Sequence, residues 1–131
     1  MRPTLQEAFD KVWKYFEANG GKRAYYKSQN ESGRCFYLAP EGNKCAIGAL
    51  VPDEVIIAAG MQHDGFSDKK FHSVLTPEVR EAFKDYLPDV SPSTLRQLQE
   101  CHDLTMDDSE VLPRLKNFAM KNQLTIPGEG A

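Results

Sequence analysis

The sequence predicts an α+β fold, a helix-rich single domain of five to six helices with one small antiparallel β-hairpin. Three observations favour this class. Several segments carry apolar residues three and four positions apart, as amphipathic helices do. Two short aromatic-rich runs flank a turn-prone segment, as hairpin strands do. The length of 131 residues suits one domain. We expect that domain to span residues 1–125, with 126–131 as a flexible C-terminal tail.

The first expected helix covers residues 5–18. Thr4 and Glu7 have the spacing of a capping box, in which each residue satisfies a backbone N–H of the other. The apolar residues that follow share one helical face: Leu5, Ala8, Phe9, Val12, Trp13 and Phe16. The segment Asn19-Gly20-Gly21 should end the helix, because glycine adopts the left-handed conformation at low steric cost.

The hairpin is expected to follow this helix. Its strands are residues 24–27 and 34–38, and the turn-forming residues 29–33 separate them. A second turn at 40–43 leads into residues 44–50, which we expect to begin as a strand and continue as a short helix of small residues.

Helices dominate the rest of the chain. Pro52 at a first helical position, followed by two acidic residues, predicts a helix over 52–59. Capping residues predict further helices over 68–75 and 77–87. Ser91-Pro92 predicts the start of a helix with Leu95, Leu98, Gln99 and His102 on one face. The last helix is expected over 110–123, with Leu112, Leu115, Phe118 and Ala119 inward.

Composition and motifs argue against several classes of protein. A net charge of −3 does not suit a general polyanion binder, so double-stranded nucleic acid is not an expected partner. The longest apolar run, 55–59, is far shorter than the ~20 residues of a membrane span. With no signal-peptide core after Met1, we expect a cytoplasmic protein that does not bind membranes. Common nucleotide-binding and hydrolase motifs are absent, and no cofactor is expected.

Of the three cysteines, Cys45 has the sequence environment that most favours a reactive thiol. It follows a glycine turn and Lys44 and precedes a possible helix, an environment that favours the thiolate. One hypothesis is therefore a cysteine hydrolase with Cys45 as nucleophile, His102 as base, and Asp103 or Gln99 as the orienting group. The pattern favours buried packing roles instead, because His102 lies on a predicted helix. A disulfide or zinc site at Cys35 and Cys45 is a further alternative.

A second hypothesis is a small-ligand site for a nucleotide-derived signal. Basic residues alternate with aromatic residues in the hairpin, a mixture that stacks bases and neutralises phosphates. The ligand-binding residues would be Arg34, Tyr37 and Lys44, with Gln99 and His102 in the floor. Such a site predicts a concave pocket, shared between subunits of a homo-oligomer. The aromatic residues equally suit a sheet face packed on a helix.

Metal binding is not expected. Gln62, His63, Asp64 and Asp68 lie close together in the sequence, and His72 follows. Their spacing matches no metal-ligand rule, so a solvated loop is the simpler interpretation.

Three segments of the chain resemble a known family. Gly-Arg-Cys at 33–35 and Lys-Cys-Ala-Ile-Gly-Ala-Leu-Val-Pro-Asp-Glu at 44–54 resemble small, mostly uncharacterised proteins of tailed-phage and prophage genomes. Those proteins carry a Cys-Ala-x-Gly-x-Leu segment and a Pro-Asp-Glu helix start. Leu-Gln-Glu-Cys-His-Asp at 98–103 is similar to their Leu-Gln-x-x-His-Asp helix. The shared motifs single out Cys45, Gly48, Gln99, His102 and Asp103.

The resemblance implies a small phage accessory protein acting in the bacterial host cytoplasm. Proteins of this class bind and inhibit a host protein or sequester a host signalling molecule. Our leading hypothesis is therefore a non-catalytic protein that binds a host factor, such as a defence component. The expected protein-binding surface is the acidic segment, which we define as Asp103, Asp107, Asp108 and Glu110, facing a basic partner. The ligand-binding and hydrolase hypotheses remain as alternatives.

Overall fold

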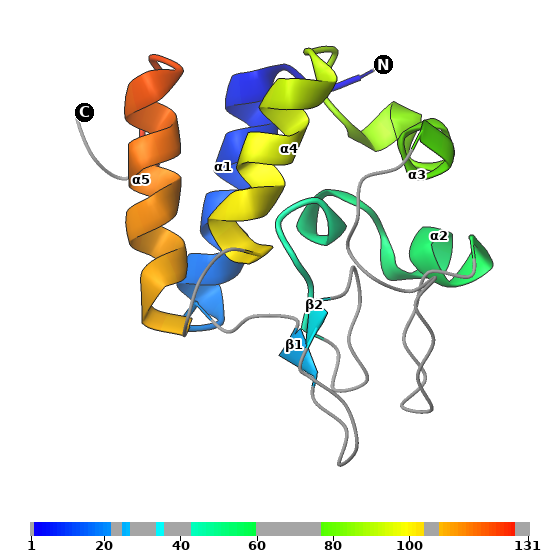
Figure 1. The fold of residues 1–131 in the computed structure, drawn as a ribbon, viewed down its shortest axis with the longest axis horizontal. Coiled ribbons are helices and arrows are strands. Elements are labelled where there is room, and N and C mark those ends of the chain that lie inside the picture. Colours follow the sequence, from blue (N-terminus) through cyan, green and yellow to red (C-terminus); the bar gives the residue numbers. More distant parts are fainter. Residues whose placement is uncertain are drawn as a thin grey trace.

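A computed structural model describes residues 2–21, 25–26, 34–35, 43–59, 77–103 and 108–127 (Figure 1). For residues 25–26, 34–35 and 103 it describes the backbone alone. The described α-helices are α1 (Leu5–Ala18), α2 (Asp53–Ala58), α3 (Pro77–Ala82), α4 (Pro92–Asp103) and α5 (Val111–Lys121). Three short 3-10 turns complete the helical part: η1 (Gly48–Leu50), η3 (Lys84–Tyr86) and η4 (Asp108–Glu110).

The fold is mainly α, so the predicted α+β class is wrong. The described residues contain no β-hairpin of the predicted kind. β1 (Tyr25–Tyr26) and β2 (Arg34–Cys35) pair antiparallel over only two residues each, with Tyr25 opposite Cys35. Aromatic residues favour strands only where a pleated surface packs against a partner. A two-stranded pairing this short has little stability of its own, and helices form the layers of the fold.

The α1 helix has the predicted bounds and the predicted capping box. The Glu7 backbone N–H donates to Thr4 Oγ1 at 3.1 Å, and the Thr4 N–H donates to Glu7 Oε1 at 2.8 Å. Gly20 and Gly21 follow the helix with φ of 73° and 79°. The Gly21 N–H donates to the Phe16 carbonyl at 2.7 Å, which closes the end of α1 as the sequence predicts.

The core lies between three long helices and η1. In Figure 1, α4 and α5 run in opposite directions, and α1 lies beside them. α4 packs on α5, while α1 packs on α5 and η1. Large apolar side chains that are almost completely buried here include Phe9, Phe16, Ile47, Leu50, Leu98 and Leu115. This arrangement holds the η1 segment between helices that are distant in sequence.

The other predicted helices differ at their ends. α2 ends at Ala58, α5 covers Val111–Lys121, and the predicted helix 77–87 divides into α3 and η3. Pro88 accounts for the stop at Leu87, because the residue before a proline is driven into extended conformation; Leu87 has φ −102° and ψ 145°. The predicted strand at the start of 44–50 is reduced to a single bridge residue, Lys44, and a turn at 46–47 leads into η1. The predicted helix 68–75 lies outside the described residues.

The end of the described chain packs on α1. The Thr125 backbone N–H donates to Gln6 Oε1 at 2.9 Å, and Gln6 Nε2 donates to the Thr125 carbonyl at 2.9 Å. Ile126, the first residue of the predicted tail, is half-buried against the core. None of the helices described here is long and apolar enough to cross a membrane.

Candidate functional site

Cys45 and Gln99 meet in the interior between η1 and α4. Cys45 precedes η1, and Gln99 lies on the face of α4 that the sequence predicts to be buried. Both are almost completely buried, with exposed fractions of 0% and 3%. The fold therefore joins two of the residues singled out by the family resemblance, 54 positions apart in the chain.

The Gln99 side chain satisfies polar groups of the buried turn. Its Oε1 accepts from the Ile47 backbone N–H at 2.8 Å, and its Nε2 donates to Cys45 Sγ at 3.0 Å. The Gly48 N–H also donates to Cys45 Sγ, at 3.3 Å. The sulfur therefore accepts two hydrogen bonds within the fold. A hydrolase also needs access for its substrate, and the complete burial of Cys45 does not supply it.

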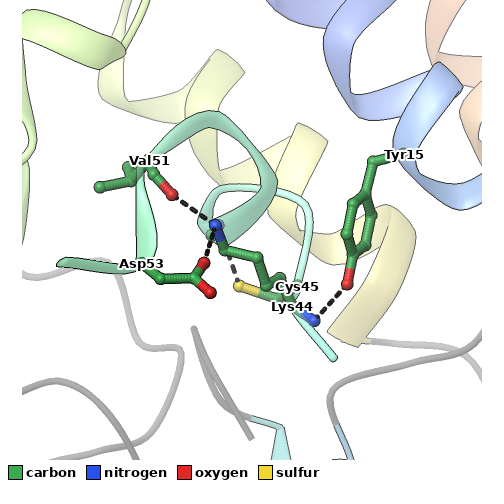
Figure 2. A network of polar contacts seen from close by, with 6 residues as sticks. Tyr15, Lys44, Cys45, Val51 and Asp53 are labelled. Carbon is green, nitrogen blue, oxygen red and sulfur yellow. Dashed lines mark hydrogen bonds and ion pairs between the residues drawn. The ribbon is translucent and has the colours of Figure 1, made fainter. Parts of the chain in front are cut away.

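Lys44 is engaged within the fold rather than turned toward a ligand. Its Nζ lies 2.7 Å from Asp53 Oδ1 and also donates to the Val51 carbonyl (Figure 2). The Lys44 side chain is 12% exposed, and Asp53 begins α2. The ammonium group therefore ties the segment before η1 to the start of α2, which leaves little of its charge for a phosphate.

Tyr15 holds the same segment from the other side. The Lys44 backbone N–H donates to the Tyr15 hydroxyl oxygen at 2.7 Å (Figure 2). Burial raises the pKa of the Tyr15 phenol, and the hydrogen bond from Lys44 offsets that effect only in part. Tyr15 therefore remains a neutral hydroxyl at neutral pH and fixes the position of the residue before Cys45.

His102 is completely buried at the end of α4. Its ring centroid lies 5.9 Å from that of Phe16 on α1, with the ring planes tilted by 38°. The imidazole thus packs between α4 and α1, as the packing interpretation of the sequence expects. This position gives the side chain no access to a substrate in solution.

The described part of the acidic segment lies at the turn from α4 to α5. Asp108 is exposed and Glu110 is half-buried in η4. The carboxylate of Glu110 lies 3.7 Å from the guanidinium of Arg114, one turn into α5. Asp103 ends α4 and is described by its backbone alone, while Asp107 lies outside the described residues.

The side chains of several other candidate residues lie outside the described part of the structure. Arg34 and Cys35 belong to β2, where only the backbone is described, and Tyr37 lies outside the described residues. The segment with Gln62, His63, Asp64, Asp68 and His72 lies outside them as well. Cys45 forms no disulfide in the structure, which contradicts the Cys35–Cys45 disulfide alternative. The described side chains form no cluster able to hold a metal ion.

Sequence reasoning missed a groove between α4 and α5. A cavity of about 210 Å³ opens there, lined by Gln97, Glu100, Cys101, Arg114, Asn117, Phe118 and Lys121. The residue spacing in α5 could have indicated this groove. Asn117, Phe118 and Lys121 lie three, four and seven positions after Arg114, which places them on one helical face. A second cavity, of about 630 Å³, lies at the start of α1 between Lys11, Leu50 and Tyr86.

The buried thiol of Cys101 predicts a pH dependence of stability. Burial raises its pKa to about 12, and the positive charge of Arg114 counteracts this only in part. A thiol in the unfolded chain ionises near pH 9 while the folded one stays neutral, so stability falls as pH rises from about 9 to about 12. Replacing Cys101 with alanine should make this decline shallower in urea unfolding at a series of pH values. An unchanged slope would contradict the shifted pKa.

Comparisons with known proteins do not identify the chain. No protein-family profile, curated protein or solved structure matches it. The function must therefore be argued from the described residues and from the resemblance set out above.

Proposed function

We propose that this chain is a phage-type accessory protein that binds a bacterial host factor, such as a defence component, without catalysis. One observation carries the proposal. The side chains considered above as reacting groups are almost completely buried: the exposed fractions of Cys45, Gln99 and His102 are 0%, 3% and 0%. Reacting groups of an enzyme must reach a substrate, whereas these side chains pack in the core or bond to the backbone of η1.

The same reasoning argues against the hypothesis that Lys44, Gln99 and His102 bind a nucleotide-like ligand. Lys44 bonds to Asp53 and Val51, and Gln99 bonds to Ile47 and Cys45. A phosphate would have to displace these bonds and leave buried polar groups without partners, which is costly. A partner protein can instead bind to the outer surface without disturbing them.

The acidic segment is the surface we assign to the host factor. Asp108 is exposed in η4, just before α5. The chain carries 19 acidic and 16 basic residues, so a cluster of acids adds to an overall negative field. A basic surface on the partner would be steered toward it and would bind faster at low salt.

Affinity capture followed by reconstitution tests the proposal. The tagged protein is incubated with bacterial lysate, and a host protein recovered in stoichiometric amount is purified and its affinity measured. The double variant Asp107→Lys and Asp108→Lys should weaken that affinity by about tenfold or more, because it places like charges at the interface. The matched control, Glu78→Lys and Glu81→Lys, changes the charge equally at exposed positions of α3 and should bind as the unmodified protein does.

Replacing Cys45 with serine separates the non-catalytic proposal from the hydrolase. The serine hydroxyl can accept hydrogen bonds, and we expect the variant to retain both the affinity for the host factor and the inhibition of its activity. Loss of inhibition with unchanged affinity would favour the hydrolase. A nucleotide released from the captured material by heat, with no host protein, would favour the ligand-binding alternative.

A further inference from the structure

From the geometry of the α4–α5 groove we infer a binding site for a carboxylate group. The groove is the 210 Å³ cavity lined by Gln97, Glu100 and Cys101 from α4, and by Arg114, Asn117, Phe118 and Lys121 from α5. This inference does not depend on the proposed function, since the groove is lined by none of the acidic-segment residues, although its Arg114 lies 3.7 Å from Glu110 of that segment.

The polar side chains of the groove have unused hydrogen-bonding capacity. Within the residues that the structure describes, the side chains of Gln97, Asn117 and Lys121 make no hydrogen bond or ion pair. Arg114 is 42% exposed and reaches Glu110 only at 3.7 Å, so most of its five donors remain available. This contrasts with Lys44 and Gln99, whose polar atoms serve the fold. The groove can therefore bind a ligand without breaking internal bonds.

The charges favour a single negative group. Arg114 and Lys121 contribute two positive charges and Glu100 contributes one negative charge. All three line the same cavity, with Cys101 in its wall. Guanidinium and ammonium groups bind carboxylates through charge-assisted hydrogen bonds, and the amides of Gln97 and Asn117 add further N–H donors.

The size and the floor of the groove limit the ligand further. A volume of about 210 Å³ is smaller than the roughly 300–1,000 Å³ of pockets that enclose a whole cofactor or drug-sized molecule. Phe118 and Cys101 are buried and provide apolar contacts beneath the polar rim. The groove thus suits a carboxylate on a short apolar chain, either a small free acid or a glutamate side chain of another protein.

Amide chemical-shift titration tests the site and distinguishes these two sources. The probes are sodium butyrate and the peptide acetyl-Gly-Gly-Glu-Gly-Gly-amide, with sodium chloride at equal ionic strength as the reference. We expect saturable shifts confined to residues 97–101 and 114–121. Saturation by butyrate alone identifies a free acid as the ligand, and saturation by the peptide alone identifies a protein side chain. Absence of saturation by both, or equal shifts with chloride, would overturn the site.

Charge variants of opposite sign make the test specific. Arg114→Gln and Lys121→Gln should each weaken binding by about fivefold, the scale of an exposed ion pair. Glu100→Gln should strengthen binding by a similar factor, because it removes a repulsive charge. Lys14 lies at an exposed position of α1, outside the groove. Lys14→Gln removes the same charge there and should not change binding. If Lys14→Gln weakened binding as much as Arg114→Gln, the attraction would be nonspecific and the site refuted.

Discussion

Replacing Gln99 with alanine is expected to lower the free energy of unfolding by about 3 kcal/mol. The variant removes the acceptor of the Ile47 N–H and a donor to Cys45 Sγ, both in the interior. A buried N–H without a partner costs about 1–3 kcal/mol, and the space left by the side chain adds a cavity term. Equilibrium urea unfolding followed by circular dichroism would measure the loss.

A second variant isolates the polar contribution of Gln99. Leucine at position 99 fills most of the same volume but bonds to neither Ile47 nor Cys45, so we expect a loss of about 2 kcal/mol. Gln97→Ala is the matched control, because Gln97 lies on the same helix with its side chain exposed, and it should change stability by less than about 0.5 kcal/mol. If Gln99→Leu were as stable as the unmodified protein, the amide would not hold η1 in place.

The importance of Gln99 was visible in the sequence, but its role was not. Helical spacing places Gln99 and His102 on the buried face of α4, and the structure has them buried there. Spacing cannot show which backbone groups a buried amide satisfies, because the Ile47 N–H lies 52 positions away. His102 likewise packs on Phe16, and this contact joins two helices that are distant in the sequence, so spacing cannot predict it.

Predictions based on local rules were the most accurate. The capping box of Thr4 and Glu7 and the glycines after α1 act between neighbouring residues, and the structure confirms both. The fold class was wrong because strand formation depends on a partner surface, and aromatic residues alone do not supply one. The α4–α5 groove was missed for a related reason: the faces predicted for the two helices were their buried apolar faces, whereas the groove is lined largely by polar residues outside them.

The contact between the end of α1 and η4 is expected to make Gly21→Ala strongly destabilising. Gly21 is buried at φ 79°, and a Cβ there would lie 2.9 Å from the Asp108 carbonyl oxygen. The left-handed conformation costs a residue with a Cβ about 1–2 kcal/mol. Relieving the overlap requires backbone movement and adds about 1–3 kcal/mol. We expect a total loss of about 3 kcal/mol in urea unfolding.

Gly20→Ala is the control that separates strain from contact. Gly20 has a similar φ of 73°, but a Cβ there would meet nothing within 4 Å. Its loss should therefore be the conformational cost alone, about 1 kcal/mol. The difference between the two variants measures how firmly η4 rests on the end of α1. Equal losses would mean that η4 moves aside at little cost. A larger loss for Gly21→Ala, with amide shifts at Asp108 and Glu110, would mean that Gly21 fixes the position of the proposed host-binding surface.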